Sequence, residues 1–133
     1  MAVVPKGYPT SACQEVSPAA DEALATVDCA RSAQPGGPTA ARFSLYPDAA
    51  TANRHFEATI GEASEVSPCP GSTKASATDW HYNSAPNEVA GRVACGRYQG
   101  RADIAWTQSK DALLGDAQSD DLAALHAWWL KFG

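Results

Sequence analysis

The chain has 133 residues, of which 44% are hydrophobic and 19% are charged, and its formal net charge at pH 7 is −5. This length fits one domain over residues 1–133, and the composition is typical of a globular protein rather than a disordered or fibrous one. The acidic balance argues against a nucleic-acid-binding protein, which needs a basic surface, and no apolar run approaches the roughly 18 residues of a membrane span.

The first part of the chain predicts an arm followed by two strands. Residues 1–23 contain three prolines among small polar residues, which indicates an irregular N-terminal arm. Residues 24–29 (LATVDC) and 39–47 (TAARFSLYP) alternate as half-buried strands do. The Pro- and Gly-rich loop between them allows the two strands to pair antiparallel.

A helix and a short strand are expected next. Residues 48–62 change to a helical period, because apolar side chains such as Phe56 and Ile60 recur four residues apart. Asp48 is the expected N-cap, since its carboxylate can accept a hydrogen bond from an unpaired amide at the helix start. After a loop, the aromatic run 79–83 (DWHYN) is predicted as a third strand.

A hairpin is expected around the sequence RYQG. The flanking runs 88–96 (EVAGRVACG) and 101–108 (RADIAWTQ) read as its strands, and Gly96 and Gly100 can supply the positive φ that hairpin turns need. The next stretch, 109–118 (SKDALLGDAQ), is interpreted as a surface connection whose two leucines contact the core.

Residues 119–133 are predicted as a closing amphipathic helix, capped by Ser119. Its buried stripe would comprise Leu122, Leu125, Trp129 and Phe132. The predicted order is therefore β-β-α-β-β-β-α. This order favours an α+β fold, with one antiparallel sheet of about five strands and two helices on one face.

The cysteines predict two disulfides. None of Cys13, Cys29, Cys69 and Cys95 stands in the CxxC spacing of a zinc ribbon or a thioredoxin-type site. Two lie in Pro-rich loops and two end strand-like runs, so we expect Cys13–Cys29 and Cys69–Cys95, each tying a loop to a strand. The other two pairings that four cysteines allow stay open.

Disulfides persist in oxidising compartments, which favours an extracytoplasmic protein. No secretory signal is recognisable in MAVVPKGYPTSAC. We therefore expect a secreted protein or the ectodomain of an anchored one, whose signal or anchor lies outside this sequence. This segment itself is not expected to insert into a membrane.

Four residues are candidates for a binding surface. Arg97, Tyr98 and Arg101 cluster at the expected hairpin turn, and Arg and Tyr are favoured anchors of binding surfaces. Ordinary solvated turn residues are the alternative interpretation of this cluster. His81 points away from its two aromatic neighbours on the predicted strand, so it can contact a ligand if that face is open.

No recognised catalytic motif is present. The chain has no GxSxG elbow, P-loop or GxGxxG, and no catalytic residue is assigned; a Ser-His-Asp triad built from distant residues stays open. Neither a metal nor a cofactor is expected. The acids do not have EF-hand spacing, and we interpret them as solvated turns and helix caps. They are Asp111, Asp116, Asp120 and Asp121.

Eight stretches of the chain carry a family resemblance: GYPTSAC, LATVDC, PGGPTAARFSLYPD, SPCPG, DWHYN, EVAGRVACG, ADIAWT and LLGDAQSDDLAALHAWW. Together they resemble a small disulfide-containing extracytoplasmic domain of mycobacteria and other actinobacteria. Such domains are similar to C-terminal segments of proteins described as serine/threonine protein kinases, and also occur as stand-alone secreted or anchored proteins. The chain has none of the kinase motifs, so the resemblance implies no kinase activity here.

These observations favour a non-catalytic extracytoplasmic sensor or ligand-binding module, whose ligand would be a cell-envelope fragment or a peptide. A protein–protein interaction or assembly module of the cell envelope is the first alternative. A small hydrolase with a convergent site is the second. We expect a monomer with no nucleic-acid partner.

Overall fold

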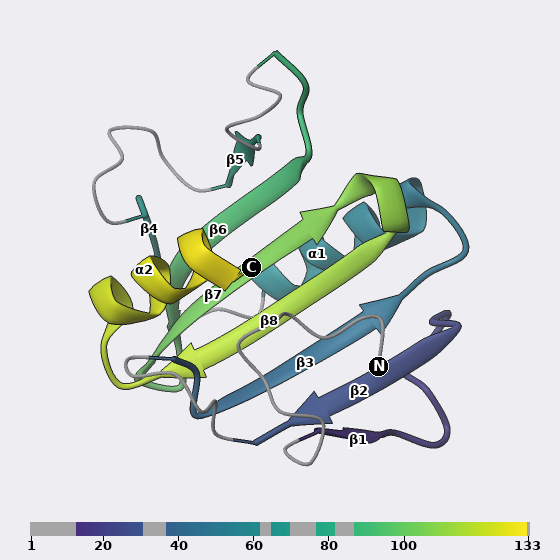
Figure 1. The fold of residues 1–133 in the computed structure, drawn as a ribbon, viewed down its shortest axis with the longest axis horizontal. Coiled ribbons are helices and arrows are strands. Elements are labelled where there is room, and N and C mark those ends of the chain that lie inside the picture. The colour runs from purple at the N-terminus through teal and green to yellow at the C-terminus, as the bar shows by residue number, and fades with distance from the viewer. Residues whose placement is uncertain (1–12, 31–36, 62–64, 70–76, 82–86, 133) are drawn as a thin grey trace.

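One antiparallel sheet organises the fold (Figure 1). The computed structural model describes residues 13–30, 37–61, 65–69, 77–81 and 87–132. The strands are β1 (Cys13–Glu15), β2 (Ala25–Cys29), β3 (Ala40–Leu45), β4 (Glu65–Ser67), β5 (Thr78–Trp80), β6 (Gly91–Tyr98), β7 (Arg101–Gln108) and β8 (Leu113–Ser119). The helices are α1 (Ala49–Gly61) and α2 (Leu122–Phe132), and neither is long and apolar enough to cross a membrane.

The strand order is β1-β2-β3-β8-β7-β6, and both β4 and β5 pair with the outer edge of β6. The α+β class, the antiparallel sheet and the two helices are confirmed, but the described sheet has eight strands rather than about five. Two of the missed strands, β1 and β4, have three residues each, too few to show an alternating pattern. β1 also lies inside the expected irregular arm 1–23, whose first 12 residues fall outside the described part.

The largest error concerns residues 109–118, predicted as a surface connection. A short 3-10 helix begins this stretch, but the rest belongs to β8, which lies in the middle of the sheet between β3 and β7. Small residues concealed the strand, because Gly115 and Ala117 occupy the positions where bulky apolar side chains would have marked the alternation.

The helices cover opposite faces of the sheet, so the prediction that both pack on one face is wrong. Along β7, Ile104 and Trp106 belong to a buried cluster with α2, whereas Ala105 belongs to a second cluster with α1. Figure 1 shows α2 in front of the sheet and α1 behind it. The physical reason is that β6, β7 and β8 present apolar side chains on both faces, and each face has to be shielded from water.

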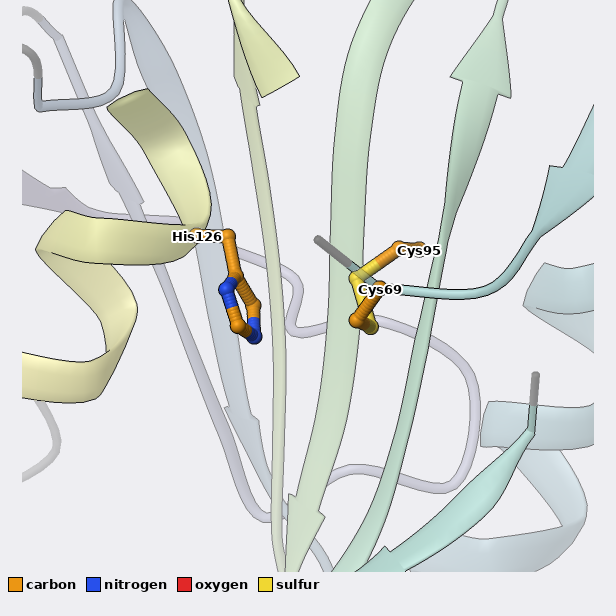
Figure 2. Close-up of side chains that lie close together, drawn as sticks. All are labelled: Cys69, Cys95 and His126. Carbon is orange, nitrogen blue, oxygen red and sulfur yellow. A yellow bond between two sulfur atoms is a disulfide. The ribbon is translucent and has the colours of Figure 1, made fainter. Parts of the chain in front are cut away.

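Both expected disulfides are present, which confirms the predicted pairing. Cys13 and Cys29 occupy directly opposite positions of β1 and β2. Cys69 follows β4 and is bonded to Cys95 of β6 (Figure 2). No free cysteine is found among the described residues. Two disulfides indicate an oxidising, extracytoplasmic environment.

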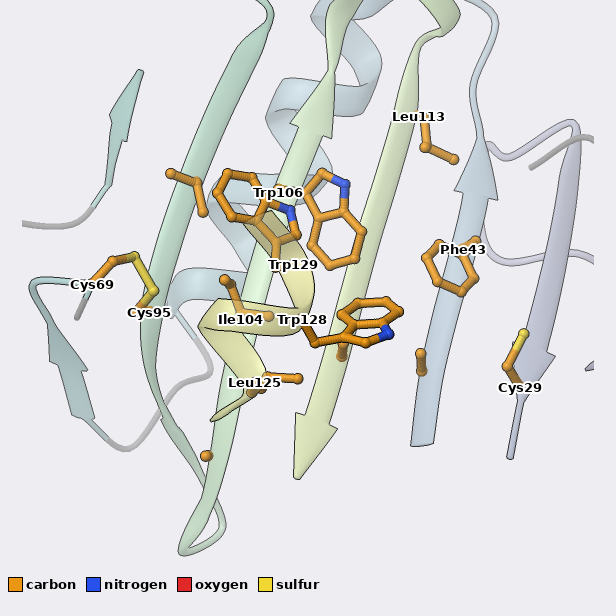
Figure 3. Close-up of a cluster of buried hydrophobic side chains, with 14 of the residues drawn as sticks. Cys29, Phe43, Cys69, Cys95, Ile104, Trp106, Leu113, Leu125, Trp128 and Trp129 are labelled. Atoms are coloured by element: carbon orange, nitrogen blue, oxygen red, sulfur yellow. A yellow bond between two sulfur atoms is a disulfide. The ribbon is translucent and has the colours of Figure 1, made fainter. Parts of the chain in front are cut away.

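The α2 side of the sheet is packed around tryptophans (Figure 3). Trp106 meets Phe43 edge to face at 5.9 Å between ring centroids and Trp129 at 6.2 Å. Trp80 in turn lies 5.5 Å from Trp129, and its indole N–H donates a 2.9 Å hydrogen bond to the carbonyl of Thr107. Edge-to-face aromatic pairs contribute about 0.5–1.5 kcal/mol each beyond their buried area.

The helix starts are set by aspartates. Asp48 caps α1 as expected, because its Oδ1 accepts hydrogen bonds from the amide and the hydroxyl of Thr51 at 2.8 and 2.7 Å. The cap of α2 is Asp121 rather than Ser119, since its Oδ1 accepts from the amides two and three residues further on. Ser119 instead ends β8. The side chain of Phe132 lies outside the described part of the structure.

Replacing Gly115 with alanine is expected to destabilise the fold. A Cβ at this position would lie 2.5 Å from Cζ2 of Trp106, inside the central aromatic packing. Overpacking of this kind costs about 1–3 kcal/mol of unfolding free energy, measurable by urea denaturation. Gly61→Ala is the matched control, because a Cβ there meets nothing within 4 Å. Equal stabilities of the two variants would contradict this account of the core.

Candidate functional site

The four sequence-predicted binding residues lie at two ends of the sheet. Arg97 and Tyr98 end β6, and Arg101 begins β7 after a two-residue turn in which Gln99 and Gly100 have φ of 52° and 81°. The positive φ expected of Gly100 is confirmed, whereas Gly96 lies within β6.

His81 is exposed and directly follows β5, which pairs with the beginning of β6 at Trp80 and Gly91. Gly91 and Arg97 are roughly 20 Å apart along the strand, at about 3.3 Å per residue. The structure therefore does not bring His81 together with the three residues of the hairpin.

The residues of the hairpin also differ in their surroundings. Arg101 hydrogen-bonds the hydroxyl of Thr39 and lies 3.4 Å from a carboxylate oxygen of Asp120, so it ties the hairpin to neighbouring segments. Tyr98 is half-buried at the end of its strand. Arg97 lines a pocket, so the predicted cluster adjoins a cavity through this residue.

The pocket lies between the C-terminal part of α1 and the sheet. Ile60 of α1, Val66 of β4, Gly96 of β6 and Asp103 of β7 contribute to its walls. The space open to the centre of a water molecule measures about 20 Å³, within a total empty volume of about 260 Å³ that includes the open mouth. A site of this size accommodates about one water molecule or one small polar group of a larger ligand.

Asp103 is the unusual residue of this pocket. The residue is only 9% exposed, and its Oδ1 has no hydrogen-bond partner among the described residues. Burial raises the pKa of Asp103 to about 9, helped by a hydrogen bond to Asp116 and by the charge of Asp116, while the backbone of Ile104 acts in the opposite direction. The carboxyl of Asp103 is therefore protonated at neutral pH.

Asp116 connects Asp103 to a row of charged side chains on the α1 face. Asp116 lies opposite Arg42 in the β3–β8 pairing, and Arg42 lies opposite Asp28 in the β2–β3 pairing. Arg42 donates two hydrogen bonds to the carboxylate of Asp28, at 2.6 and 2.9 Å. The bond to Asp28 raises the pKa of Arg42, and the charges of Asp28 and Asp116 add to this effect.

The interpretation of Asp116 as a solvated turn residue is wrong, because it is half-buried in the middle of β8. Asp111, in contrast, is exposed in the 3-10 helix before that strand. Sequence reasoning also overlooked Asp103. The available signal was an aspartate inside the otherwise apolar run ADIAW, since aspartate is depleted in strands and is rarely buried without a specific reason.

A second cluster lies on the other face of the sheet. Within the described part of the chain, one group of three potential metal ligands is found: Sγ of Cys69, Sγ of Cys95 and a ring nitrogen of His126, all within 4.8 Å of one another. Figure 2 shows the His126 imidazole on the side of α2 that faces the disulfide. Because the two sulfurs are bonded to each other, they are not thiolate ligands in this state.

When the chain is compared with protein-family models, curated proteins and solved structures, no family, relative or structure matches it significantly.

The stability of the protein is expected to fall as the pH rises from about 4 to about 9, through the contribution of Asp103. Its pKa is about 9 in the folded protein against an ordinary 3.8, so between these values the folded state binds one more proton than the unfolded state. Asp103→Asn keeps an uncharged hydrogen-bonding group, so we expect the variant to lose less stability than the wild type between about pH 5 and about pH 8.5.

Thermal denaturation of both proteins at the two pH values measures this difference. The exposed Asp111→Asn is the control for removing one negative charge, and it should follow the wild-type pH dependence. Parallel pH profiles for the wild type and Asp103→Asn would show that the pKa of Asp103 is not raised in the folded protein.

Proposed function

We propose that this chain is a non-catalytic, extracytoplasmic ligand-binding module of the sensor type, with the pocket beside Asp103 as its binding site. The observation that carries the proposal is the Oδ1 atom of Asp103, which is buried in the pocket wall without a hydrogen-bond partner among the described residues. An unsatisfied buried polar atom costs about 1–3 kcal/mol. A ligand that donates a hydrogen bond to this atom would remove that cost.

The protonation of Asp103 defines the chemistry of the ligand. With its proton directed to Asp116, the remaining Oδ1 is an acceptor that favours a neutral donor, such as a hydroxyl or an amide N–H. The narrow space selects one such group rather than a whole sugar ring. Arg97 also lines this pocket. Cell-envelope glycans and peptides carry such hydroxyl and amide groups.

Three further considerations support this assignment. The disulfides suit an extracytoplasmic location, as does the resemblance to extracytoplasmic domains of actinobacteria. The net charge of −5 disfavours nucleic acid as a partner. Among the described residues, the exposed large apolar side chains lie on separate segments, a distribution that is normal for a monomer and gives weaker support to an assembly module. They are Leu24, Val66, Val89 and Leu130.

A small hydrolase is the second candidate, and the pairing of Asp103 with Asp116 is the observation in its favour. A carboxyl with a raised pKa beside a second carboxyl is an arrangement that acid–base catalysis uses. However, a direct hydrogen bond places the two groups closer together than the about 5–9.5 Å that glycoside hydrolases require. Space for about one water molecule also leaves little room for a scissile bond. Binding is therefore the better-supported function.

Thermal-shift measurements with defined envelope fragments test the proposal. We expect N-acetylglucosamine, muramyl dipeptide or short neutral peptides to raise the Tm of the wild type. A ligand at 100 times its Kd stabilises the folded state by about 2.7 kcal/mol. Asp103→Leu removes the acceptor and should abolish the shift, whereas Asp103→Asn keeps an acceptor oxygen and should retain it.

The same mixtures, followed by mass spectrometry, distinguish binding from hydrolysis. Unchanged probes together with a shift specific to the wild type and Asp103→Asn support the binding module. Equal shifts for the wild type and Asp103→Leu, or no shift with any of these probes, would count against the pocket as the binding site. Cleaved probes would favour the hydrolase.

A further inference from the structure

We propose that reduction of the Cys69–Cys95 disulfide opens a metal site in which both cysteine sulfurs and the imidazole of His126 bind a zinc-like divalent cation. The site lies on the α2 face of the sheet, whereas the Asp103 pocket lies beside α1, and Cys95 of β6 contributes to both. The proposal does not rest on the proposed function, because it uses neither Asp103 nor a ligand bound beside it.

The geometry of the three side chains is the first argument. Their ligand atoms lie within 4.8 Å of one another. Bond lengths of about 2.3 Å to sulfur and about 2.0–2.1 Å to nitrogen around a tetrahedral ion place ligand atoms roughly 3.5–3.8 Å apart. Once the S–S bond is broken, movements on the order of an ångström bring the set to this spacing.

The placement of His126 is the second argument. Its imidazole is half-buried on the side of α2 that faces the disulfide (Figure 2). The ring stacks on Trp129 with 5.8 Å between centroids, and this contact orients it on α2. Within the described residues, no hydrogen bond occupies either ring nitrogen. A nitrogen is therefore available to a cation without displacing a protein partner.

The reaction balances with a dithiol as the reductant. The dithiol gives up two electrons and two protons and becomes a cyclic disulfide, while the S–S bond between Cys69 and Cys95 breaks to give two thiols. The cation then binds both sulfurs as thiolates and releases their two protons to solvent. In the reverse direction, the cyclic disulfide takes up the two electrons, together with two protons from solvent, and returns to the dithiol. The S–S bond of Cys69 and Cys95 then re-forms and the ion leaves, because this bond uses the same sulfur atoms. Disulfide and metal are thus alternative occupants of one site.

Ligand chemistry selects the ion. Two thiolates and one imidazole suit zinc and related soft or borderline ions, whereas calcium and magnesium prefer oxygen. Three protein ligands leave a fourth position for water or an exogenous group, as in catalytic rather than structural zinc sites. His126 is only half-buried, so this position has a route to solvent.

The other disulfide provides an internal control. Cys13 and Cys29 join two paired strands, and no third potential ligand accompanies them among the described residues. Cys13→Ser/Cys29→Ser therefore retains the proposed site, whereas Cys69→Ser/Cys95→Ser removes it. His126→Gln keeps all four sulfurs and removes only the imidazole.

Titration with Co²⁺, a spectroscopic substitute for Zn²⁺, tests the proposal. Each protein is studied oxidised and after reduction by a phosphine that is then removed anaerobically, and circular dichroism records whether the reduced chain keeps its fold. We expect thiolate-to-cobalt charge-transfer and tetrahedral ligand-field bands, at one ion per chain, in the reduced wild type and reduced Cys13→Ser/Cys29→Ser. The oxidised wild type and reduced Cys69→Ser/Cys95→Ser should show none.

His126→Gln should bind the ion at least about tenfold more weakly, which is the cost of disturbing even the outer partners of a metal ligand. Zn²⁺ should also slow alkylation of Cys69 and Cys95 in the reduced wild type, but not that of Cys13 and Cys29. No bands in the reduced wild type, or equal binding by His126→Gln, would overturn the proposal. Equal binding by Cys69→Ser/Cys95→Ser would overturn it as well, because it would indicate unspecific thiolate binding by an unfolded chain.

Discussion

The need to cover both faces of the central strands determines most of this structure. Ile104 and Trp106 of β7 point to one face while Ala105 points to the other, and all three are buried. A sheet with apolar side chains on both faces is stable only as the middle layer of three. The two helices supply the outer layers, and they differ in character. α2 packs tryptophans against β7 and β8, whereas α1 lies closer to a surface of small residues.

α1 packs against smaller side chains than α2 does, and this difference affects the chemistry of the face that α1 covers. Phe56 and Ala52 cover the part of the sheet near Ala94, Ala105 and Leu114. Outside the area that α1 covers, the same face of the sheet carries the row of Asp28, Arg42, Asp116 and Asp103. Asp103 lies at the boundary, where burial is nearly complete but a pocket remains. The candidate site is thus located where an apolar layer meets a polar one, and this position accounts for the raised pKa of Asp103.

The elements that could be predicted from the sequence are those whose signals are local. β2, β3 and the β6–β7 hairpin show alternation and turn residues, and α1 shows a helical period with an aspartate cap. The loop-and-strand argument predicts the right disulfide pairing, although Cys13 lies in strand β1 rather than in a loop. β8 was missed because its positions on the α2 face include Gly115, which leaves space for the indole of Trp106 on the neighbouring strand β7. Local patterns cannot encode which face each helix covers, because that choice depends on both sides of every strand.

The candidate site was predictable only in part, for the same reason. Arg97 could be singled out from its turn, but Asp103, which also lines the pocket, gains its properties from Asp116 on another strand and from its burial beside α1. The group of Cys69, Cys95 and His126 likewise requires α2 to bring His126 close to Cys95 of β6, which no spacing in the sequence reveals. Sites of this kind emerge from strand register and layer packing rather than from a motif.

The position of β8 has a consequence for how the protein is made. β8 comes last of the strands along the chain, yet it joins β3 to β7 and so links the two halves of the sheet. During synthesis, β1–β3 and the β6–β7 hairpin emerge earlier, each with an open edge that only β8 can close. Such non-local pairing delays folding and leaves strand edges exposed to other chains. Until β8 is complete, correct folding therefore depends on conditions that keep the two partly formed half-sheets from pairing with other chains.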